Sequence, residues 1–403
     1  MTRNWIAPRG PAVNDGAMVF SFPEDVPTLT DGEITLRAHA LSDVDDVLVQ
    51  GSDPESIRWT TVPVPYSRED ATGFVTEMVS SGWLTRKDLC FAIEAPHADG
   101  VRRFSGSISL RPMDAGVAEL AFGLHPGVRG QGVCSRAVKL ILDWGFTQAD
   151  IELVVWYAHV GNWASWRVVW ANGFSFDGKV AKFLAQRGER HDAWCGSLRK
   201  DDTREPKHEW NVPPTVETDR LRLRPHTDAD GARFIEMMSD ERSRHFSGRN
   251  SPAHNLPPAE RVLLRPREFD ARGERFDWTI ADRETDEFIG QMQLFHLGGL
   301  DNTAAELGYA VHPEARGKGV LTEALGMVVD CAFTDKKKGG LGLRRLSLST
   351  AASNKASRHA AEKAGFTHVA THPESFPTGE SGFEDETIYA RINQSWTDLS
   401  TTD

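Results

Sequence analysis

The sequence has little of three features that would each indicate a class of protein. Only four cysteines occur among 403 residues, at positions 90, 134, 195 and 331, and their spacing fits neither a disulfide framework nor a metal site. No apolar run is long enough for a transmembrane helix, and the N-terminus lacks the apolar core of a signal peptide. We therefore expect a cytoplasmic protein, in a reducing compartment, with no bound metal and no membrane partner.

Positive charge is scarce as well. Lys and Arg number 46 against 58 Asp and Glu, a formal net charge of −12. Nucleic-acid-binding proteins usually carry a basic patch, and the one lysine run here, residues 336–338, precedes two glycines as a solvated loop would. The charge balance therefore argues against nucleic acid as a partner.

What the sequence does contain is a repeated stretch. Residues 119–133 read ELAFGLHPGVRGQGV, and residues 306–320 read ELGYAVHPEARGKGV. Each copy has a strand-like alternation that begins at a glutamate, then a His-Pro pair, then an Arg-Gly-x-Gly loop before an amphipathic helix pattern. Arg129 and Arg316 are 187 positions apart, and so are Arg37 and Arg224 in the first predicted strand of each half. The shared offset predicts a duplicated domain.

The order of strand and helix patterns in each half predicts a mixed α/β domain. A chain of this length can hold two such domains, each with its own core. We predict an extended arm at residues 1–30, domains at 31–200 and 216–396, and a polar, proline-containing linker at 201–215. Residues 53–68 and 240–258 show no shared pattern, so we expect the two halves to differ most there.

The Arg-Gly-x-Gly loop has the composition of an anion-binding turn. Gly130 and Gly132 allow backbone conformations that other residues avoid, so successive N–H groups can point at one anion. Unpaired N–H groups at the start of the next helix, with the positive end of its dipole, would complete such a site. A simple tight turn before a helix would have the same sequence. The loop is neither a nucleoside-triphosphate P-loop nor a Gly-x-Gly-x-x-Gly motif.

Both stretches resemble the acetyl-CoA-binding motif of the GNAT superfamily of N-acetyltransferases. A second motif, Asn-x-x-Ser followed by Gly-Phe, occurs at residues 162–174 and 354–366 and resembles the ribosomal-protein N-terminal acetyltransferase branch. Together the resemblances cover nearly all of residues 33–200 and 216–394. They imply two tandem domains, each a mixed β-sheet that splays open after the glutamate strand, with acetyl-CoA in the gap.

The resemblance also implies which residues hold the cofactor. The family pattern usually begins with Gln or Arg, where this chain has Gly127 and Glu314, but Arg129 and Arg316 supply a cation two places later. The implied set in the first half is Phe122, Gly123, Leu124, Arg129, Gly130, Gln131, Gly132, Val133, Cys134 and Asn162. In the second half it is Tyr309, Ala310, Val311, Arg316, Gly317, Lys318, Gly319, Val320, Leu321 and Asn354. The asparagines would also cap helices, and Cys134 at a helix start could have a lowered thiol pKa.

Acetylation of an amine needs a base for the ammonium proton and an acid for the leaving thiolate. Glu119 and Glu306 share a strand face with small residues, which leaves room for a ligand beside a catalytic base; each could instead pair with an arginine at the sheet surface. Ser165 and Ser357 match the serine that the ribosomal-protein branch places near the thiolate, although a serine in a first helical turn needs no function. Many family members have a tyrosine acid later in this helix, where the chain has valine and alanine, at positions 169 and 361.

The sequence thus predicts an acetyl-CoA-dependent N-acyltransferase in which a primary amine attacks directly. The amine would belong to a small molecule, an antibiotic-like compound or a peptide N-terminus. The alternatives are one catalytic domain joined to a degenerate binding or scaffold domain, and an acyl-CoA sensor without turnover. If only one half is active, we expect it to be the second, which matches the motifs more closely. The oligomeric state is left open.

Overall fold

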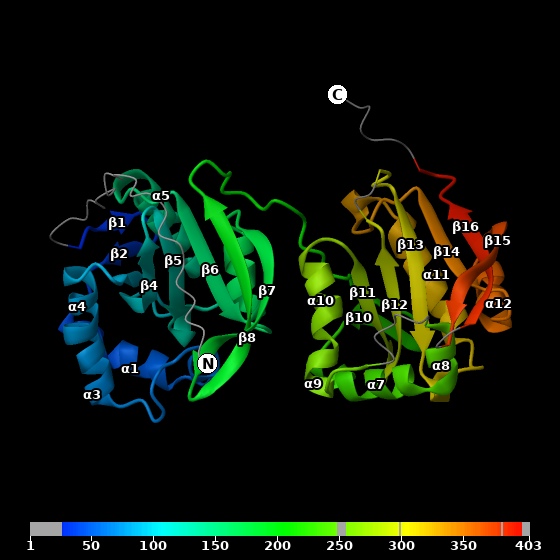
Figure 1. Cartoon of the computed structure of the whole chain (residues 1–403), viewed down its shortest axis with the longest axis horizontal. Coiled ribbons are helices and arrows are strands. Elements are labelled where there is room, and N and C mark those ends of the chain that lie inside the picture. The colour runs from blue at the N-terminus through cyan, green and yellow to red at the C-terminus, as the bar shows by residue number, and fades with distance from the viewer. Residues whose placement is uncertain (1–25, 248–254, 298–299, 380–381, 397–403) are drawn as a thin grey trace, which may run out of the picture. The chain divides into compact units, whose positions relative to one another are not determined.

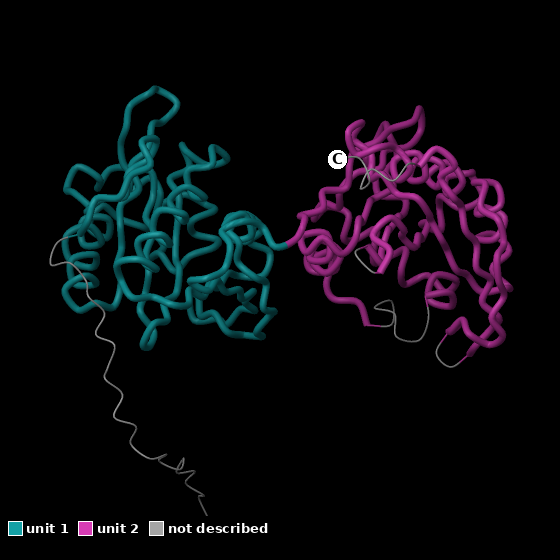
Figure 2. Tube along the Cα trace, turned by 90° about the horizontal axis from the view of Figure 1, so that it is seen from above, with its two compact units in different colours: residues 1–207 teal, residues 208–403 magenta. Residues whose placement is uncertain are grey.

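The computed structural model describes residues 26–247, 255–297, 300–379 and 382–396. The chain forms two compact units, residues 1–207 and 208–403 (Figures 1 and 2). The change from unit 1 to unit 2 lies within the predicted linker, residues 201–215. Most of the predicted arm is outside the described ranges, and its last residues, Leu29–Thr30, form a strand of unit 1.

Unit 1 has an eight-stranded mixed sheet with helices on both faces (Figure 1). Its strands are β1 (Leu29–Thr30), β2 (Thr35–Arg37), β3 (Leu89–Pro96), β4 (Arg102–Asp114), β5 (Val117–Leu124), β6 (Leu153–His159), β7 (Ser175–Gln186) and β8 (Glu189–Arg199). Its α-helices are α1 (Val44–Ser52), α2 (Pro54–Trp59), α3 (Arg68–Gly73), α4 (Val79–Leu84), α5 (Val133–Gln148) and α6 (Trp163–Trp170). The strands are ordered β1-β2-β3-β4-β5-β6-β8-β7, with β5 and β6 parallel.

Unit 2 repeats this arrangement. Its strands are β9 (Val216–Glu217), β10 (Leu221–Pro225), β11 (Phe276–Asp282), β12 (Phe288–Phe295), β13 (Ala304–Val311), β14 (Arg345–Ala351), β15 (Thr367–Thr378) and β16 (Gly382–Ile392). Its α-helices are α7 (Gly231–Ser239), α8 (Glu241–Phe246), α9 (Ala259–Val262), α10 (Leu264–Ala271), α11 (Val320–Phe333) and α12 (Lys355–Lys363). The sheet order, β9-β10-β11-β12-β13-β14-β16-β15, is that of unit 1, and β13 and β14 are parallel. The predicted mixed α/β class is confirmed for both halves.

Side-chain periodicity explains how the helices attach. The apolar residues Val133, Ala137, Ile141 and Trp144 recur along one face of α5 and are all buried, as expected of a helix that packs on a sheet. In unit 2 the helix α11 packs in the same way, and its core includes Trp278 of β11. A second cluster on α7 and α9 packs around Phe288 of β12. Each sheet is therefore covered on both faces.

Both sheets open at the same place. In unit 1 the parallel pairing of β5 with β6 runs from Val117 to Leu120 and stops, although β5 continues to Leu124. In unit 2 the pairing of β13 with β14 stops at Glu306, although β13 continues to Val311. Beyond these points the facing edges of the two strands are not joined by a ladder. The splayed sheet expected after the glutamate strand is therefore present in each unit.

Candidate active site

Each Arg-Gly-x-Gly loop contains two glycines in the left-handed region. Gly130 and Gly132 have φ of 75° and 77°, and Gly317 and Gly319 have φ of 74° and 77°. Residues with a Cβ are disfavoured there. A Cβ at Gly130, Gly132 or Gly317 would meet no atom within 4 Å. The backbone conformation, not crowding, therefore requires glycine, and the space beside the loop can accommodate a ligand.

The helix starts at these loops offer unused donors. In α5, the Arg136 N–H donates to the Gly132 carbonyl oxygen at 3.2 Å, and in α11 the Glu323 N–H donates to that of Gly319 at 3.2 Å. The N–H groups earlier in each first turn have no helical acceptor, and they lie at the positive end of the helix dipole. This arrangement suits a phosphate or pyrophosphate.

The loop arginine of unit 1 is tied to a neighbouring helix. The Arg129 guanidinium donates to the Asp53 carboxylate at 2.6 Å and to the Ser56 hydroxyl at 3.2 Å. Asp53 also caps α2 by accepting from the Ser56 N–H. Burial alone would raise the pKa of Asp53, but the hydrogen bonds from Arg129 and Ser56 and the Arg129 charge together outweigh burial and lower that pKa. The predicted phosphate cation is therefore already paired with a carboxylate and fixes the loop to α2.

Unit 2 contains the same arrangement, in which the loop arginine is held by the aspartate and serine of a neighbouring helix cap, and we call this arrangement the arginine clamp. Arg316 lies 2.7 Å from the Asp240 carboxylate and donates to the Ser243 hydroxyl at 2.9 Å, and Asp240 caps α8 through the Ser243 N–H. These residues follow those of unit 1 by the same 187 positions. The interpretation that residues 53–68 and 240–258 share no pattern is therefore wrong. An Asp-x-x-Ser cap occurs in both of these otherwise different segments, and in both it contacts the loop arginine.

The glutamate of unit 1 is half-buried. The Glu119 side chain is 29% exposed, and the nearest cation is Arg111, with Nη1 3.8 Å from Oε1. Burial raises the pKa of Glu119 above its usual value, although the Arg111 charge opposes the shift. A carboxylate with a raised pKa is a better proton acceptor. The alternative of an arginine partner therefore holds in unit 1, where Arg111 and Glu119 form an ion pair without a hydrogen bond.

The glutamate of unit 2 has different partners. The Ser349 hydroxyl donates to Glu306 Oε1 at 3.3 Å, and His296 Nδ1 lies 3.2 Å from Oε2. Ser349 is on β14, two residues beyond Ser347, which pairs with Glu306 where the sheet begins to open. In the described part of unit 2 no arginine pairs with this glutamate. The carboxylate thus lies at the base of the opening, oriented by a hydroxyl and a largely exposed histidine.

The asparagines of the second motif cap their helices, as expected. Asn162 accepts from the Ser165 N–H at 3.2 Å, and Asn354 accepts from the Ser357 N–H at 3.4 Å. Arg242 of α8 also donates to the Asn354 side chain at 3.3 Å. The cap role is confirmed; contact with the cofactor stays a prediction.

The hydroxyl of each predicted catalytic serine has a partner that sequence reasoning missed. In unit 2 the Tyr309 hydroxyl lies 2.7 Å from Ser357 Oγ. Tyr309 is on β13 beyond Glu306, whereas Ser357 is on α12, which follows β14, so this contact spans the opening. Burial raises the pKa of Tyr309 to about 12. In unit 1 the Trp156 indole N–H donates to Ser165 Oγ at 3.0 Å. The sequence signal that could have revealed the Tyr309 contact was the tyrosine at the position that aligns with Phe122 when the two repeats are compared.

The remaining predicted cofactor residues include both buried and exposed side chains. Cys134 is buried, and burial raises its thiol pKa to about 12, so the expected lowering at a helix start is wrong because desolvation of the thiolate outweighs the dipole. Val133 and Val320 are also core residues and can present only backbone to a ligand. Gln131 and Lys318 are exposed at the loop tips. The others lie along the splayed strands or in the first turn of α11: Phe122, Gly123, Leu124, Ala310, Val311 and Leu321.

The model of the acetyltransferase (GNAT) domain family matches residues 33–175 and again 220–367, which together are more than half of the chain. The chain belongs to the GNAT family. Both units are GNAT domains, and the protein is an N-acetyltransferase.

Three similar proteins illustrate the relationship. An uncharacterized N-acetyltransferase of Bacillus subtilis (strain 168), YoaA, is 33% identical over 159 residues, which are 38% of this chain and 82% of that protein. The ribosomal-protein-S5-alanine acetyltransferase of Vibrio fischeri is 19% identical with a TM-score of 0.40, and the match covers 46% of this chain and 99% of that one. The self-immunity acetyltransferase MccE, solved with acetyl-CoA and AMP, is 20% identical with a TM-score of 0.38 over 42% and 93%.

The described part of this GNAT protein includes no helix that is long and apolar enough to cross a membrane. Nor do three or more His, Cys, Asp or Glu side chains gather in these ranges as metal ligands would.

Proposed function

We propose that this GNAT protein transfers an acetyl group from acetyl-CoA to a primary amine of a small molecule or a peptide N-terminus, and that unit 2 is the stronger catalytic centre. The observation that carries the proposal is the Tyr309–Ser357 contact across an opening that has Glu306 at its base. A candidate base, Glu306, and a pair of hydroxyl groups thereby lie at the same opening. Unit 1 has the glutamate and the serine but not the tyrosine.

The residues fit acetyl-CoA. The loop glycines leave open space, and the helix starts offer unpaired N–H groups for its pyrophosphate. The strand edges of the opening suit an extended, amide-containing arm, because unpaired backbone can bind such a ligand as a further strand. When bound, acetyl-CoA supplies an activated acetyl thioester. In unit 2 the holding residues would be Gly317, Lys318 and Gly319 at the loop, Ala310 and Val311 on the strand, and Asn354.

Glu306 would take the proton from the attacking ammonium group. Its Oε1 accepts from Ser349 and its Oε2 faces His296, so the carboxylate is held in one orientation. A positioned base of this kind contributes roughly a hundred- to ten-thousand-fold to rate. His296 is 74% exposed and could pass the proton to solvent. Glu119 would play the same part in unit 1.

Ser357 would give a proton to the leaving thiolate. The raised pKa of Tyr309 keeps its phenol protonated at neutral pH. Tyr309 can therefore donate to Ser357 Oγ while the serine proton points into the opening, and it can return a proton to the serine afterwards. In unit 1 the indole N–H of Trp156 orients Ser165, but it is a far weaker acid than a phenol and would not return a proton to the serine. We infer from this difference that unit 1 is the slower centre.

An acceptor screen tests the proposal. The full chain is incubated with acetyl-CoA and pools of primary amines that include aromatic amines, polyamines, aminoglycosides and short peptides, and products that have gained one acetyl group in place of an amine hydrogen are sought by mass spectrometry. We expect at least one acceptor whose turnover falls with Glu306→Gln. Acetylation that depends only on Glu119 would overturn the assignment to unit 2. Tight coenzyme A binding without turnover on any amine would favour the sensor alternative.

A further inference from the structure

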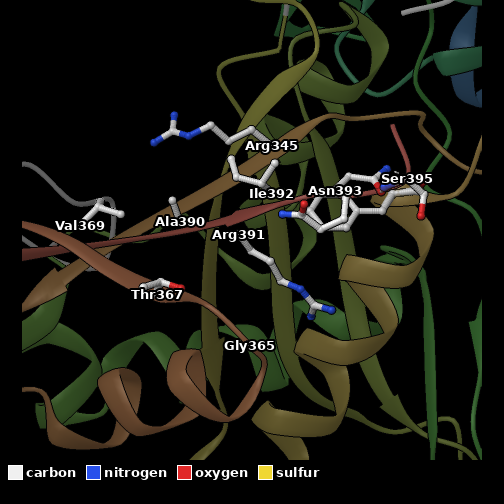
Figure 3. A pocket seen from close by; sticks show the side chains of 11 residues that line it. Arg345, Gly365, Thr367, Val369, Ala390, Arg391, Ile392, Asn393 and Ser395 are labelled. Carbon is white, nitrogen blue, oxygen red and sulfur yellow. Dashed lines mark hydrogen bonds between the residues drawn. The ribbon is translucent and has the colours of Figure 1, made fainter. Parts of the chain in front are cut away.

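A pocket in unit 2 lies away from the opening (Figure 3). It has a volume of about 660 Å³ and is lined by Phe333, Gly365 and Arg391, among other residues. Phe333 ends α11, a helix of 14 residues that begins at the Arg-Gly-x-Gly loop, so this end is roughly 20 Å from the loop. The Arg391 guanidinium already lies 3.4–3.5 Å from where a Cβ on Gly365 would be. The side chains that select an acceptor must therefore be sought at the openings.

Aromatic side chains line one face of the unit 1 opening. Glu119 of β5 pairs with Val155 of β6, and the pairing of the two strands stops one residue later. Alternate residues of a strand share a face. Tyr157 and His159 therefore lie on the face of Glu119, on the part of β6 that β5 no longer pairs. Burial raises the pKa of Tyr157, and nearby negative charges that include Glu119 raise it further, as expected if the phenol and the carboxylate are neighbours.

Three more rings extend this face. The Phe183 ring of β7 lies 4.7 Å from the Tyr157 ring, and the His191 ring of β8 lies 5.1 Å from the His159 ring, measured between centroids. The Trp59 ring of α2 lies 6.4 Å from the His159 ring. None of these five side chains is fully buried. We call them the aromatic surface, and a ligand at the opening can reach it.

Hydrogen bonds join the aromatic surface to the Arg-Gly-x-Gly loop. Gln186, the last residue of β7, is buried, and its side-chain N–H groups donate to the carbonyl oxygens of Arg58 at 3.1 Å and Thr60 at 2.5 Å. The β7–β8 hairpin is thereby attached to the end of α2. The start of α2 is held by Arg129 through the arginine clamp. The aromatic surface is therefore fixed relative to the loop that would bind the cofactor.

The matching positions of unit 2 carry small and acidic side chains. The repeat offset of 192 places Ser349 and Ala351 of β14 at the positions of the β6 tyrosine and histidine. The strand registers place Glu384 at the position of the β8 histidine and Ser375 at that of the β7 phenylalanine. Only the α2 tryptophan has an aromatic counterpart, Phe246 of α8. The two openings therefore differ in the groups that they offer to an acceptor.

We propose that unit 1 acetylates an amine that carries an aromatic ring, with the ring on the aromatic surface and the amine beside Glu119. The proposal rests on the acetyl transfer proposed above and names the acceptor class of unit 1. Aromatic rings attract one another beyond the effect of burial, and ring faces also attract an ammonium group. Burial, with the charge of His191, lowers the pKa of His159, so this ring is neutral at pH 7 and does not repel the ammonium group.

The transfer step follows that of unit 2. The amine nitrogen bonds to the acetyl carbon while the carbon–sulfur bond breaks. The ammonium nitrogen loses two protons in all: one goes to Glu119, and one reaches the thiolate through Ser165. The aromatic surface takes no part in this exchange, so it determines which amine binds and not how the proton moves.

A matched pair of amines tests the ring preference in the full chain. Phenylethylamine and cyclohexylethylamine have the same amine and chain length, and only the first is aromatic. Calorimetry at saturating coenzyme A measures the binding of each amine, and turnover in the Glu306→Gln chain reports on unit 1. We expect phenylethylamine to be favoured about two- to tenfold in affinity and in kcat/KM, which is the range that aromatic pairs contribute beyond burial.

Three variants locate the ring. The double variant Tyr157→Ser, His159→Ala gives unit 1 the side chains of unit 2 and should abolish the preference. Tyr157→Phe keeps the ring and should keep the preference, which separates loss of stacking from loss of the hydroxyl. Phe246→Leu removes a ring from unit 2 alone and is the matched control, so it should leave the preference unchanged. Thermal midpoints establish that the variants fold.

Equal affinity of the two amines, or a preference that the double variant leaves intact, would overturn the proposal. So would a preference that Phe246→Leu removes, because the ring would then lie in unit 2. If neither amine is acetylated but the binding preference follows the Tyr157 and His159 variants, acetyl transfer fails and the aromatic site stands. If the Glu306→Gln chain acetylates both amines with equal kcat/KM, acetyl transfer stands and the aromatic site fails.

Discussion

In each unit an ion pair fixes the start of the long helix, but the helix residue is a cation in unit 1 and an anion in unit 2. In unit 1 Arg136 of α5 pairs with Asp31 at 2.8 Å. In unit 2 the residue 187 positions later is Glu323, and it pairs with Arg220. The contact is kept while its polarity is inverted, and in unit 2 the Arg220 guanidinium also donates to the carbonyl oxygen of Lys318 in the Arg-Gly-x-Gly loop at 3.3 Å. A position shared between the units can therefore keep its contact while its charge changes sign.

The units differ in another way at the opening. Unit 1 has Phe122 where unit 2 has Tyr309. Phenylalanine lacks the hydroxyl, so unit 1 lacks the contact across the opening. In unit 1 the Trp156 indole N–H donates to Ser165 Oγ instead, so the serine keeps a partner but has no second hydroxyl beside it.

The arginine clamp of Arg129 and Arg316, in contrast, is the same in both units. The loop contacts are therefore preserved in both halves, whereas the Tyr309–Ser357 hydroxyl pair occurs only in the second.

The largest effect is expected at the glutamates. Glu306→Gln keeps the shape of the side chain but removes the base, so we expect kcat to fall roughly a hundred- to ten-thousand-fold with coenzyme A affinity unchanged. The deficit should shrink as pH rises, because more of the amine is then already deprotonated. Glu119→Gln should lower the total rate much less. The kcat/KM profile against pH for both variants, with their thermal midpoints, measures this.

A Glu306→Gln enzyme that is stable and fully active would remove this residue from the catalytic set. If the two glutamine variants lose equal fractions of activity, the proposed inequality between the units is wrong.

A smaller loss is expected from the hydroxyl pair. Tyr309→Phe should lower kcat about tenfold with little change in KM, and Ser357→Ala should lower it by at least as much. In the double variant the two losses should not add, because both act through one proton. Phe122→Tyr is the converse test: it should raise any activity that remains in Glu306→Gln. Single-turnover kinetics of these variants gives the rates, and additive losses would contradict a shared proton.

Cofactor binding should respond to the loop glycines in each unit separately. Gly132→Val and Gly319→Val force a β-branched residue into a left-handed conformation, which costs on the order of 1–3 kcal/mol and displaces the N–H donors. Calorimetry with coenzyme A should find two sites in the unchanged chain and one in each variant. A single site in the unchanged chain would contradict the interpretation that each Arg-Gly-x-Gly loop binds one coenzyme A. Gly326→Ala, in the middle of α11 with nothing within 4 Å of its Cβ, is the matched control.

The sequence was sufficient to predict the duplicated fold because each half repeats strands, loop glycines and helix caps at fixed offsets. It could not reveal the role of Arg129, since the carboxylate that pairs with it lies 76 positions earlier and only the fold brings the two together. The Tyr309–Ser357 contact has the same cause: their residues are 48 positions apart, on opposite sides of the opening. The thiol pKa of Cys134 depended on burial, which the motif did not show.

The smallest expected effect is on the free energy of unfolding. It arises because the core of unit 2 contains a buried aspartate where unit 1 has a cysteine. Asp277 of β11 is fully buried; its Oδ1 accepts from Gln293 at 2.5 Å, and its N–H donates to Asp270 Oδ1 at 3.0 Å. Burial raises the pKa of both carboxyl groups, and for Asp270 the nearby Asp277 charge raises it further. Unit 1 has Cys90 at this position, and burial raises its thiol pKa as well, so this cysteine stays neutral throughout the physiological range.

The direction of the pH effect follows from these raised pKa values. Between the unfolded pKa of an aspartate, about 3.9, and the higher folded values, folded unit 2 binds more protons than the unfolded chain. Its stability should therefore be greatest in mild acid and decline as pH rises through neutral. Asp277→Asn keeps the bond from Gln293 and removes the ionisable group, so it should stabilise unit 2 by about 1–3 kcal/mol at pH 8 and have little effect at pH 5. Cys90→Ser in unit 1 should change stability by the same amount at both pH values. Urea unfolding at pH 5, 6, 7 and 8 measures both variants, and an Asp277→Asn chain whose stability differs from the unchanged chain by the same amount at every pH would show that ionisation of Asp277 does not affect the stability of unit 2.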